Sequence, residues 1–385
     1  MIHLLALDQK SLKRPLQRAK MDKTFFDILP AVYRRFLPDF FSQPVPPERR
    51  ATCQSCVMLS PEGAEEQEPF KRESFLPTTK CCTFRPNIPN YLVGGILSHS
   101  GADMAEGQRR ILQTIKSKDG VHPRWLKTPK NPAQHIAGKE ALRFGRSEVL
   151  RCPYYKVAMG GCTIWSYRNG ICSTYFCRYE QGEDGHIFWK ELQNVLQSYE
   201  ASLSYFAIQQ VAPELLKYFD GNRFQKTLTL EDILNKLPPA QDYVRRWGAW
   251  AGKEEAFYRA CYQVISELTQ DSLQDLLPIP GEPEQLDTDE LKKHYKALYT
   301  TDLPETLSLH PELICLSIDE ETLLVTAYNP LDPITISKQE FARLECVLDA
   351  SKGPKKWRHL VEGEEALFEE AYIRKLYQMR VLITA

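Results

Sequence analysis

The sequence has no long hydrophobic run. Its uninterrupted apolar stretches are short, as at residues 91–97, whereas a transmembrane helix needs about 18 or more apolar residues in a row. Residues 1–7 are apolar, but no basic residues precede them and no small-residue cleavage site follows them, so we expect no signal peptide. These absences predict a cytoplasmic protein with no membrane segment.

An excess of charge of one sign is also lacking. The 385 residues include 49 Lys and Arg against 50 Asp and Glu, for a net charge of −1 at pH 7. This balance gives no overall field that would attract nucleic acid, so no nucleic-acid partner is indicated. A hydrophobic content of 43% is enough for folded cores, and the length suits about two or three domains.

Several catalytic motifs are missing as well. The sequence contains no P-loop, no G-x-G-x-x-G, no G-x-S-x-G, no EF-hand loop and no H-E-x-x-H. The C-x-x-x-C-x-x-C of radical SAM enzymes is absent too. These absences argue against nucleotide hydrolysis, Rossmann cofactors and serine hydrolase chemistry in their usual forms.

Cysteine, in contrast, is plentiful and clustered. Eight of the eleven cysteines fall within residues 53–177: Cys53, Cys56, Cys81, Cys82, Cys152, Cys162, Cys172 and Cys177. In a reducing compartment, clustered cysteines are more often metal ligands or redox groups than disulfides. We therefore expect these eight to bind metal, with disulfides or free thiols as the alternative. The other three, Cys261, Cys315 and Cys346, sit among apolar neighbours and are expected in the core.

Two spacings within the cysteine window bear on the kind of site. Cys53 and Cys56 form a C-x-x-C pair, the commonest arrangement for two thiolates on one metal or cluster. Cys81 and Cys82 are adjacent, and neighbouring side chains point in different directions in both strands and helices. We therefore expect the adjacent pair to reach two metal atoms or two separate sites.

The number of thiolates limits the possible metals. Eight ionised thiolates need compensating positive charge, which two Cys₄ zinc sites, two [4Fe–4S] clusters or one larger cluster would supply. The adjacent pair and the lack of two C-x-x-C knuckles favour iron–sulfur, most simply [4Fe–4S], with zinc as the alternative. Aromatic residues that could shield a cluster crowd the cysteines: Tyr154, Tyr155, Trp165, Tyr167, Tyr175, Phe176 and Tyr179.

Charged and imidazole side chains in the same region are weaker candidates. Three arginines are placed to offset cluster charge, although each is equally well explained as a surface residue: Arg85, Arg168 and Arg178. Four histidines could add a ligand or a proton donor, but none has a recognised metal spacing: His99, His122, His135 and His186.

The patterning along the chain divides into four segments. Residues 1–50 are basic and helical in pattern, and residues 51–180 form the irregular cysteine region, rich in Gly, Pro and aromatics. Residues 181–300 are helical, with the clearest apolar periodicity over 186–211. The sequence thus predicts a mainly α protein with an irregular, metal-organised cysteine region and a small α/β domain at residues 305–385.

The last segment has a pattern of its own. Residues 313–318 and 323–327 are typical of two strands, and residues 337–340 form a capping box that opens a helix. A second helix around 367–376 and a strand at 381–383 follow. The order resembles the winged-helix-like PqqD domains of peptide-modification systems, which implies a protein or peptide partner. A purely structural cap is the alternative.

The cysteine region resembles a known family. Residues 162–172, Cys-Thr-Ile-Trp-Ser-Tyr-Arg-Asn-Gly-Ile-Cys, are similar to the C-x-I-[aromatic]-x-x-R-P-x-x-C signature of the YkgJ-type cysteine-cluster proteins. Cys152 matches a cysteine usually found ten residues upstream. Asn169 stands where the family has Pro, and Cys177 lies a few residues beyond its usual last cysteine.

The family's upstream C-x-x-C-x-x-C-C is matched by Cys53-x-x-Cys56 and Cys81-Cys82, separated here by a 24-residue insertion. The resemblance covers about residues 50–180 and implies a zinc- or iron-chelating domain. Flagellin lysine methylases carry a similar cysteine cluster, which implies methyl transfer as one use. The sequence therefore favours a redox or electron-transfer protein, or one whose cluster supports protein or peptide modification. The alternative is a non-catalytic zinc-stabilised interaction module.

Overall fold

The computed structural model describes residues 23–48, 53, 56–59, 74–127, 144–218, 240–271, 288–299, 302–348, 355–362 and 367–385. These residues are mainly α-helical with small antiparallel sheets, as the sequence predicts. The basic stretch before residue 23, His135 and most of the insertion between Cys56 and Cys81 lie outside the described residues.

The helices of the described residues are α1 (Phe25–Ile28), α3 (Asn90–Ser98), α4 (Ala105–Ser117), α6 (Gly170–Thr174), α7 (Gly182–Val211), α9 (Ala240–Trp247), α10 (Glu254–Ser266), α12 (Asp289–Ala297), α13 (Lys338–Val347), α14 (Arg358–Val361) and α15 (Glu370–Gln378). The strands are β1 (Ile88–Pro89), β2 (Trp125–Leu126), β3 (Tyr155–Lys156), β4 (Gly161–Cys162), β5 (Thr306–Leu309), β6 (Ile314–Ser317), β7 (Thr322–Thr326), β8 (Ile334–Ser337), β9 (Lys355–Lys356) and β10 (Leu382–Thr384).

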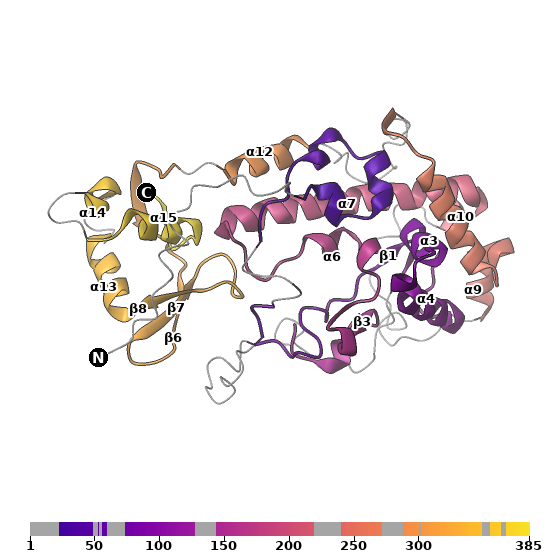
Figure 1. Cartoon of the computed structure of the whole chain (residues 1–385), viewed down its shortest axis with the longest axis horizontal. Coiled ribbons are helices and arrows are strands. Elements are labelled where there is room, and N and C mark those ends of the chain that lie inside the picture. The colour runs from indigo at the N-terminus through magenta and orange to yellow at the C-terminus, as the bar shows by residue number, and fades with distance from the viewer. Residues whose placement is uncertain are drawn as a thin grey trace.

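Helix α7 is the long element on which the N-terminal part of the protein is built (Figure 1). It contains the periodic stretch 186–211 that the sequence predicts, and its buried side chains include Phe188, Leu192, Leu196 and Leu203. Residues spaced by three or four positions share one helix face, so this face is apolar. Helices α3, α6, α10 and α12 all contact α7, which makes it the common support of the helical core and of the cysteine region.

The N-terminal segment packs against α7 as short turns. Phe25 lies between aromatic rings, with centroid separations of 5.9 Å to Phe188, 6.1 Å to Trp189 and 6.0 Å to Tyr295 of α12. One cluster of buried residues extends from Phe25 to Leu298 and draws on all three segments that the sequence analysis separates before residue 300. These segments therefore share one hydrophobic core.

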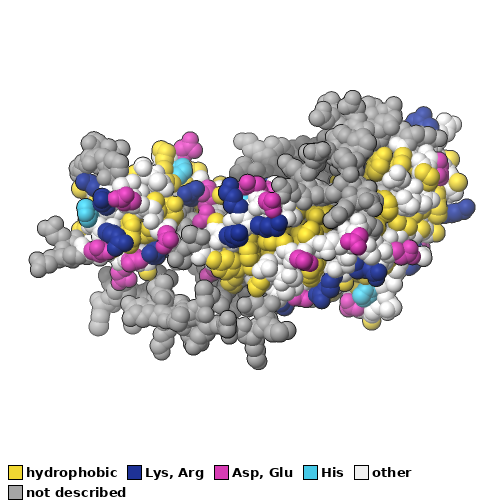
Figure 2. Space-filling model, turned by 90° about the horizontal axis from the view of Figure 1, so that it is seen from above, with side chains coloured by type: hydrophobic (Ala, Val, Ile, Leu, Met, Phe, Trp, Pro, Cys, Tyr) yellow, Lys and Arg dark blue, Asp and Glu magenta, His cyan; other side chains and the backbone are white. Residues whose placement is uncertain are grey.

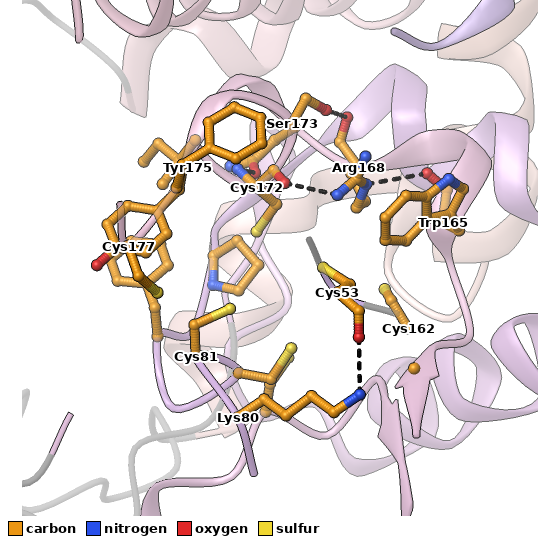
Figure 3. Close-up of a pocket in the computed structure, with 18 of the residues that line it drawn as sticks. Cys53, Lys80, Cys81, Cys162, Trp165, Arg168, Cys172, Ser173, Tyr175 and Cys177 are labelled. Carbon is orange, nitrogen blue, oxygen red and sulfur yellow. Dashed lines mark hydrogen bonds between the residues drawn. The ribbon is translucent and has the colours of Figure 1, made fainter. Parts of the chain in front are cut away.

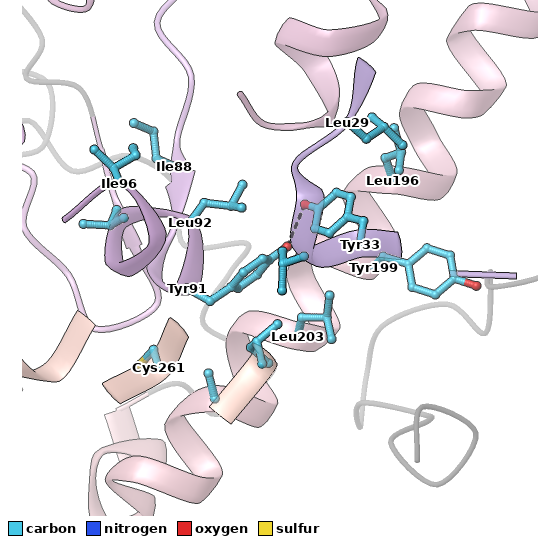
Figure 4. Packing of buried hydrophobic residues seen from close by; sticks show 14 of the residues in the cluster. Leu29, Tyr33, Ile88, Tyr91, Leu92, Ile96, Leu196, Tyr199, Leu203 and Cys261 are labelled. Atoms are coloured by element: carbon cyan, nitrogen blue, oxygen red, sulfur yellow. Dashed lines mark hydrogen bonds between the residues drawn. The ribbon is translucent and has the colours of Figure 1, made fainter. Parts of the chain in front are cut away.

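A buried polar network joins three parts of this core. Tyr91 donates to Tyr33 across 2.8 Å, as Figure 4 shows, and Tyr33 donates to Glu200 of α7 across 3.1 Å. The Gly170 amide at the start of α6 donates to the same carboxyl oxygen at 2.6 Å. Burial raises the pKa of Glu200 to about 8, although the amide and hydroxyl donors oppose the rise.

This carboxyl predicts a pH-dependent stability. Folded Glu200 keeps its proton up to about pH 8, whereas an unfolded glutamate loses it near pH 4.3. Between these values the unfolded chain binds fewer protons, so Glu200 lowers the free energy of unfolding by at most about 1.4 kcal/mol per pH unit. Glu200→Gln keeps an oxygen acceptor, and we expect its urea-unfolding free energy to fall less than that of the unchanged protein between pH 5 and 8. Identical pH profiles would refute this assignment.

The C-terminal residues form a second buried cluster, made from α13, α14, α15 and the strands around them. Strands β6, β7 and β8 make one antiparallel sheet in that order, and β10, β5 and β9 make another. The predicted strand pair, the capping box from Ser337 to Glu340 and the final strand are confirmed. In Figure 1 these elements gather at the end of the molecule away from α9 and α10.

The expected burial of the three outlying cysteines is confirmed for only one. Cys261 is buried in α10, but Cys315 in β6 and Cys346 in α13 are exposed. All four residues of β6, an edge strand of its sheet, are exposed, so neither face of this strand is packed against the core. Cys346 lies on the face of α13 opposite the side that buries Leu344. Apolar neighbours along the chain therefore misled the prediction for both.

Charged side chains of both signs are mixed across the face shown in Figure 2. Several pairs lie one helical turn apart, such as Lys292 with Asp289 at 2.7 Å and Arg374 with Glu370 at 2.6 Å. Exposed pairs of this kind stabilise a helix by only a few tenths of a kcal/mol. In the described part of the chain, no helix is both long and apolar enough to cross a membrane.

Candidate metal centre

A small hairpin and a loop bring three of the cysteines together. Strands β3 and β4 pair with Tyr155 opposite Cys162, and Cys152 precedes the hairpin. The Cys152 amide donates to the Cys82 carbonyl at 2.7 Å. This backbone hydrogen bond joins the adjacent cysteine pair to a segment about 70 residues later in the chain.

Helix α6 positions the next cysteine. Asn169 caps the helix, because its side-chain oxygen accepts from the Cys172 amide at 3.1 Å while its amide group donates to the Asn87 carbonyl at 3.2 Å. Arg168 donates to the Cys172 carbonyl at 2.8 Å and stacks over Trp165, 3.4 Å from its ring centroid. Asn169, which stands where the family signature has Pro, thus makes two hydrogen bonds that a proline could not.

All eight predicted cysteines line a single cavity of about 650 Å³ between these loops and α6. Figure 3 shows Cys53, Cys81, Cys162, Cys172 and Cys177 around this space. The three outlying cysteines, all within the described residues, are not part of its lining. The structure therefore gathers the predicted set from stretches of chain separated by up to 124 residues (from 53 to 177).

Six of the eight cavity thiols have pKa values above the usual thiol value. Burial raises the pKa of Cys152 to about 12 and raises the pKa values of Cys162 and Cys172 above the usual thiol value. Hydrogen bonding to the Cys81 thiol, followed by burial, raises the pKa values of Cys53 and Cys177. Because thiolates are the metal ligands, a metal that binds here must displace protons.

Cationic side chains surround the cavity. Lys80 donates to the carbonyls of Cys53 and Gly160 at 2.8 and 2.9 Å, as Figure 3 shows for the first of these. The charge of Arg168 opposes the rise in pKa of Cys53, Cys162 and Cys172. Thiols and positively charged side chains therefore line the same cavity, and the positive charge favours the thiolate form of the cysteines.

The other arginines have different positions. Arg85 donates to the Val149 carbonyl at 3.0 Å and its charge acts on Cys152. Arg178 donates to the Leu331 carbonyl at 3.2 Å, so its side chain binds the loop between β7 and β8. The sequence analysis did not predict Lys80 or Arg110. The charge of Arg110 lowers the pKa of Cys162. Lys80 adjoins the cysteine pair and could have been found, but Arg110 lies on α4 and had no local signal.

None of the histidines in the described part of the chain lines the cavity. His99 hydrogen-bonds to the Tyr167 hydroxyl at 3.3 Å and to Asp103 at 3.2 Å. His122 is bonded to Arg246, and His186 lies beside the rings of Tyr179 and Tyr328. These three partner with protein groups and do not extend the candidate ligand set.

Aromatic and apolar side chains make up much of the cavity wall. Of the seven aromatics singled out from the sequence, five line the cavity: Tyr154, Tyr155, Trp165, Tyr175 and Phe176. Phe84 and Phe144 were not predicted and also line it. Trp165 is half exposed, so the cavity lining reaches the molecular surface at this residue.

Residues 329–332, in the loop between β7 and β8, contact the backbone around Cys177, which the sequence did not indicate. Asn329, between β7 and β8, donates to the Cys177 carbonyl at 3.1 Å. Asp332 accepts from the Tyr179 amide at 3.0 Å, and Leu331 packs against the small cluster that contains Cys177. The loop between β7 and β8 therefore holds the backbone that follows α6.

Within the described residues, no three Cys, His, Asp or Glu side chains are already close enough to hold one ion. The thiols share a cavity, but chelation of one ion would require their side chains to move closer together.

No family model matches the chain, and comparisons with curated proteins and with solved structures likewise found no match. The YkgJ-type resemblance therefore remains an expectation carried by the residues quoted for it.

Proposed function

We propose that this protein is an iron–sulfur protein of the YkgJ type, in which the eight cavity cysteines hold the cluster or clusters. The observation that carries the proposal is their convergence on one cavity of about 650 Å³. A bound cluster would supply one-electron chemistry. The function follows as electron transfer or redox sensing, or as support for modifying a bound protein or peptide, methyl transfer included.

The donor set and its surroundings support iron–sulfur over zinc. Thiolates are the ligands of both, but eight of them in one apolar, aromatic-walled space suit a buried cluster whose potential the wall tunes. Lys80 and Arg168 lie where they would offset cluster charge. A zinc centre that only stabilises an interaction module is the alternative, and the two differ in colour and in redox behaviour.

We propose the C-terminal domain as the place where a protein or peptide partner docks. Strand β6 is the edge of its sheet, and Ile314 and Leu316 on it are 59% and 53% exposed. An edge strand has unpaired backbone groups, and an extended peptide can pair with them. The loop after β7 contacts the Cys177 backbone, so a partner on this domain would be next to the metal centre.

The decisive experiment is anaerobic purification followed by a visible spectrum and the measurement of iron, zinc and sulfide per chain. We expect a brown protein whose broad visible absorption bleaches with dithionite, with iron and sulfide at roughly four or eight per chain. One or two zinc ions without sulfide would replace the proposal with the structural alternative. A protein that binds neither metal would refute both.

A further inference from the structure

We infer that the eight cysteines form two separate four-thiolate metal sites. This division rests on the proposed metal-binding function and adds which ligands belong together. The first site consists of Cys53, Cys56, Cys81 and Cys177. The second site consists of Cys82, Cys152, Cys162 and Cys172.

The packing of the first set separates it from the main core. Cys177 is buried in a small cluster with Met58 and Phe75, and Cys56 and Cys81 pack against that same cluster. Phe176 packs against both this cluster and the main core, so the two are neighbours. Three cysteines from distant parts of the sequence thus share one local environment.

The second set belongs to the main core. Cys152 is a buried member of it, and Cys82 and Cys162 pack against it. The Cys152 amide bonds to the Cys82 carbonyl at 2.7 Å, and the β3–β4 hairpin that follows Cys152 carries Cys162 on β4. These contacts bring the backbones of three of the proposed ligands together.

The adjacent pair is therefore split, with Cys81 in one environment and Cys82 in the other. Consecutive side chains diverge, so two neighbouring cysteines seldom bind a single tetrahedral centre. The structure turns this steric expectation into an assignment, because it shows which way each of the two thiols goes.

The remaining two cysteines complete the sets. Lys80, the residue before Cys81, donates to the Cys53 carbonyl at 2.8 Å, which joins Cys53 to the segment that carries Cys81. The Cys81 thiol is also the first cause of the raised pKa values of Cys53 and Cys177. The charges of Cys152 and Cys162 raise the pKa of Cys172 more than that of Cys81 does, so two thiols of the second set influence Cys172 most. The charge of Cys53 also raises the pKa of Cys162, a member of the second set. Figure 3 shows Cys53 and Cys162 beside the same space, so the two proposed sites adjoin at Cys53.

Each set has its own cation. The positive charge of Lys80 lowers the pKa values of Cys53 and Cys56, whereas that of Arg110 lowers the pKa of Cys162. Arg168 acts on thiols of both sets, namely Cys53 and Cys172. Two anionic centres would therefore share one arginine between them and each keep a further positive charge.

The test counts metal in serine variants of the full chain. Cys56→Ser and Cys152→Ser should each remove about half of the bound metal. The same-site pair Cys56→Ser with Cys177→Ser should remove no more than either change alone. The cross-site pair Cys56→Ser with Cys152→Ser should remove nearly all of it. Loss of all metal in one single variant, or equal loss in the two double variants, would overturn the division.

A second measurement needs no variant. The unchanged metal-loaded protein is treated with increasing chelator and then with iodoacetamide, and the labelled cysteines are identified by mass spectrometry. Thiols of one set should become labelled together, before those of the other. Mixed sets, or all eight thiols at once, would contradict the division. A purified protein without bound metal would instead contradict the proposed function, so the two failures are distinguishable.

Discussion

Cys172→Ser is expected to lower the bound metal by at least about half. Cys172 lines the cavity from α6, where its amide is held by Asn169 and its carbonyl by Arg168. A serine hydroxyl fits the same backbone, but it does not replace a thiolate as a metal ligand. The measurement is metal per chain after anaerobic purification, together with the melting temperature, since a lost metal also removes its stabilisation of the folded state.

The chain offers two matched controls for this change. Cys261 is buried in α10 away from the cavity, so Cys261→Ser should retain all of the metal. It should still lower stability by about 1–3 kcal/mol, because a hydroxyl replaces a thiol in an apolar core. Cys346 is exposed, and Cys346→Ser should change neither quantity. If all three variants contained the same amount of metal, the eight cysteines would not be its ligands.

Gly94→Ala is expected to destabilise the fold by about 3 kcal/mol or more. Gly94 lies on α3 where this helix crosses α10, and an added methyl group would lie 1.9 Å from the Tyr258 carbonyl oxygen. That oxygen belongs to the backbone of a helix, so relief requires α3 and α10 to move apart. This movement would partly expose the buried side chains of both helices. Equilibrium unfolding in urea would measure the resulting decrease in the free energy of unfolding.

Gly161→Ala is the control for this prediction. It also adds one methyl group, but the nearest atom beyond the two flanking residues, the Met159 carbonyl oxygen, is 3.8 Å from that group, an ordinary contact distance. We expect a change within about 0.5 kcal/mol, typical of substitutions without a steric or polar conflict. Equal stability of the two variants would show that the α3–α10 crossing tolerates a wider separation.

Local patterns were reliable where an element depends on its own residues. The apolar periodicity of 186–211 predicted most of α7, and the capping box at Ser337 predicted where α13 begins. Helical hydrogen bonds are made within a segment, so a one-dimensional pattern contains most of the information. The pairing of β6 with β7 also followed, because the two strands are joined by a short turn.

Long-range pairing could not be predicted in the same way. Strand β10 pairs with β5, about 75 residues earlier, and β5 pairs with β9. The strands are only two to four residues long, too short for a distinctive alternation. The prediction that Cys315 and Cys346 are buried was wrong for a related reason. Apolar neighbours in the sequence do not determine which face of a strand or helix packs against the core.

The sequence by itself determined the candidate ligands, because only cysteine supplies soft thiolate donors and only eight of the eleven are clustered. It also determined that Cys81 and Cys82 would diverge, since that follows from backbone geometry. Tertiary structure alone decided that all eight face one cavity, which cations approach them, and that the loop after β7 holds the Cys177 backbone. Those are contacts between distant residues, and they form only once the core around α7 brings the segments together.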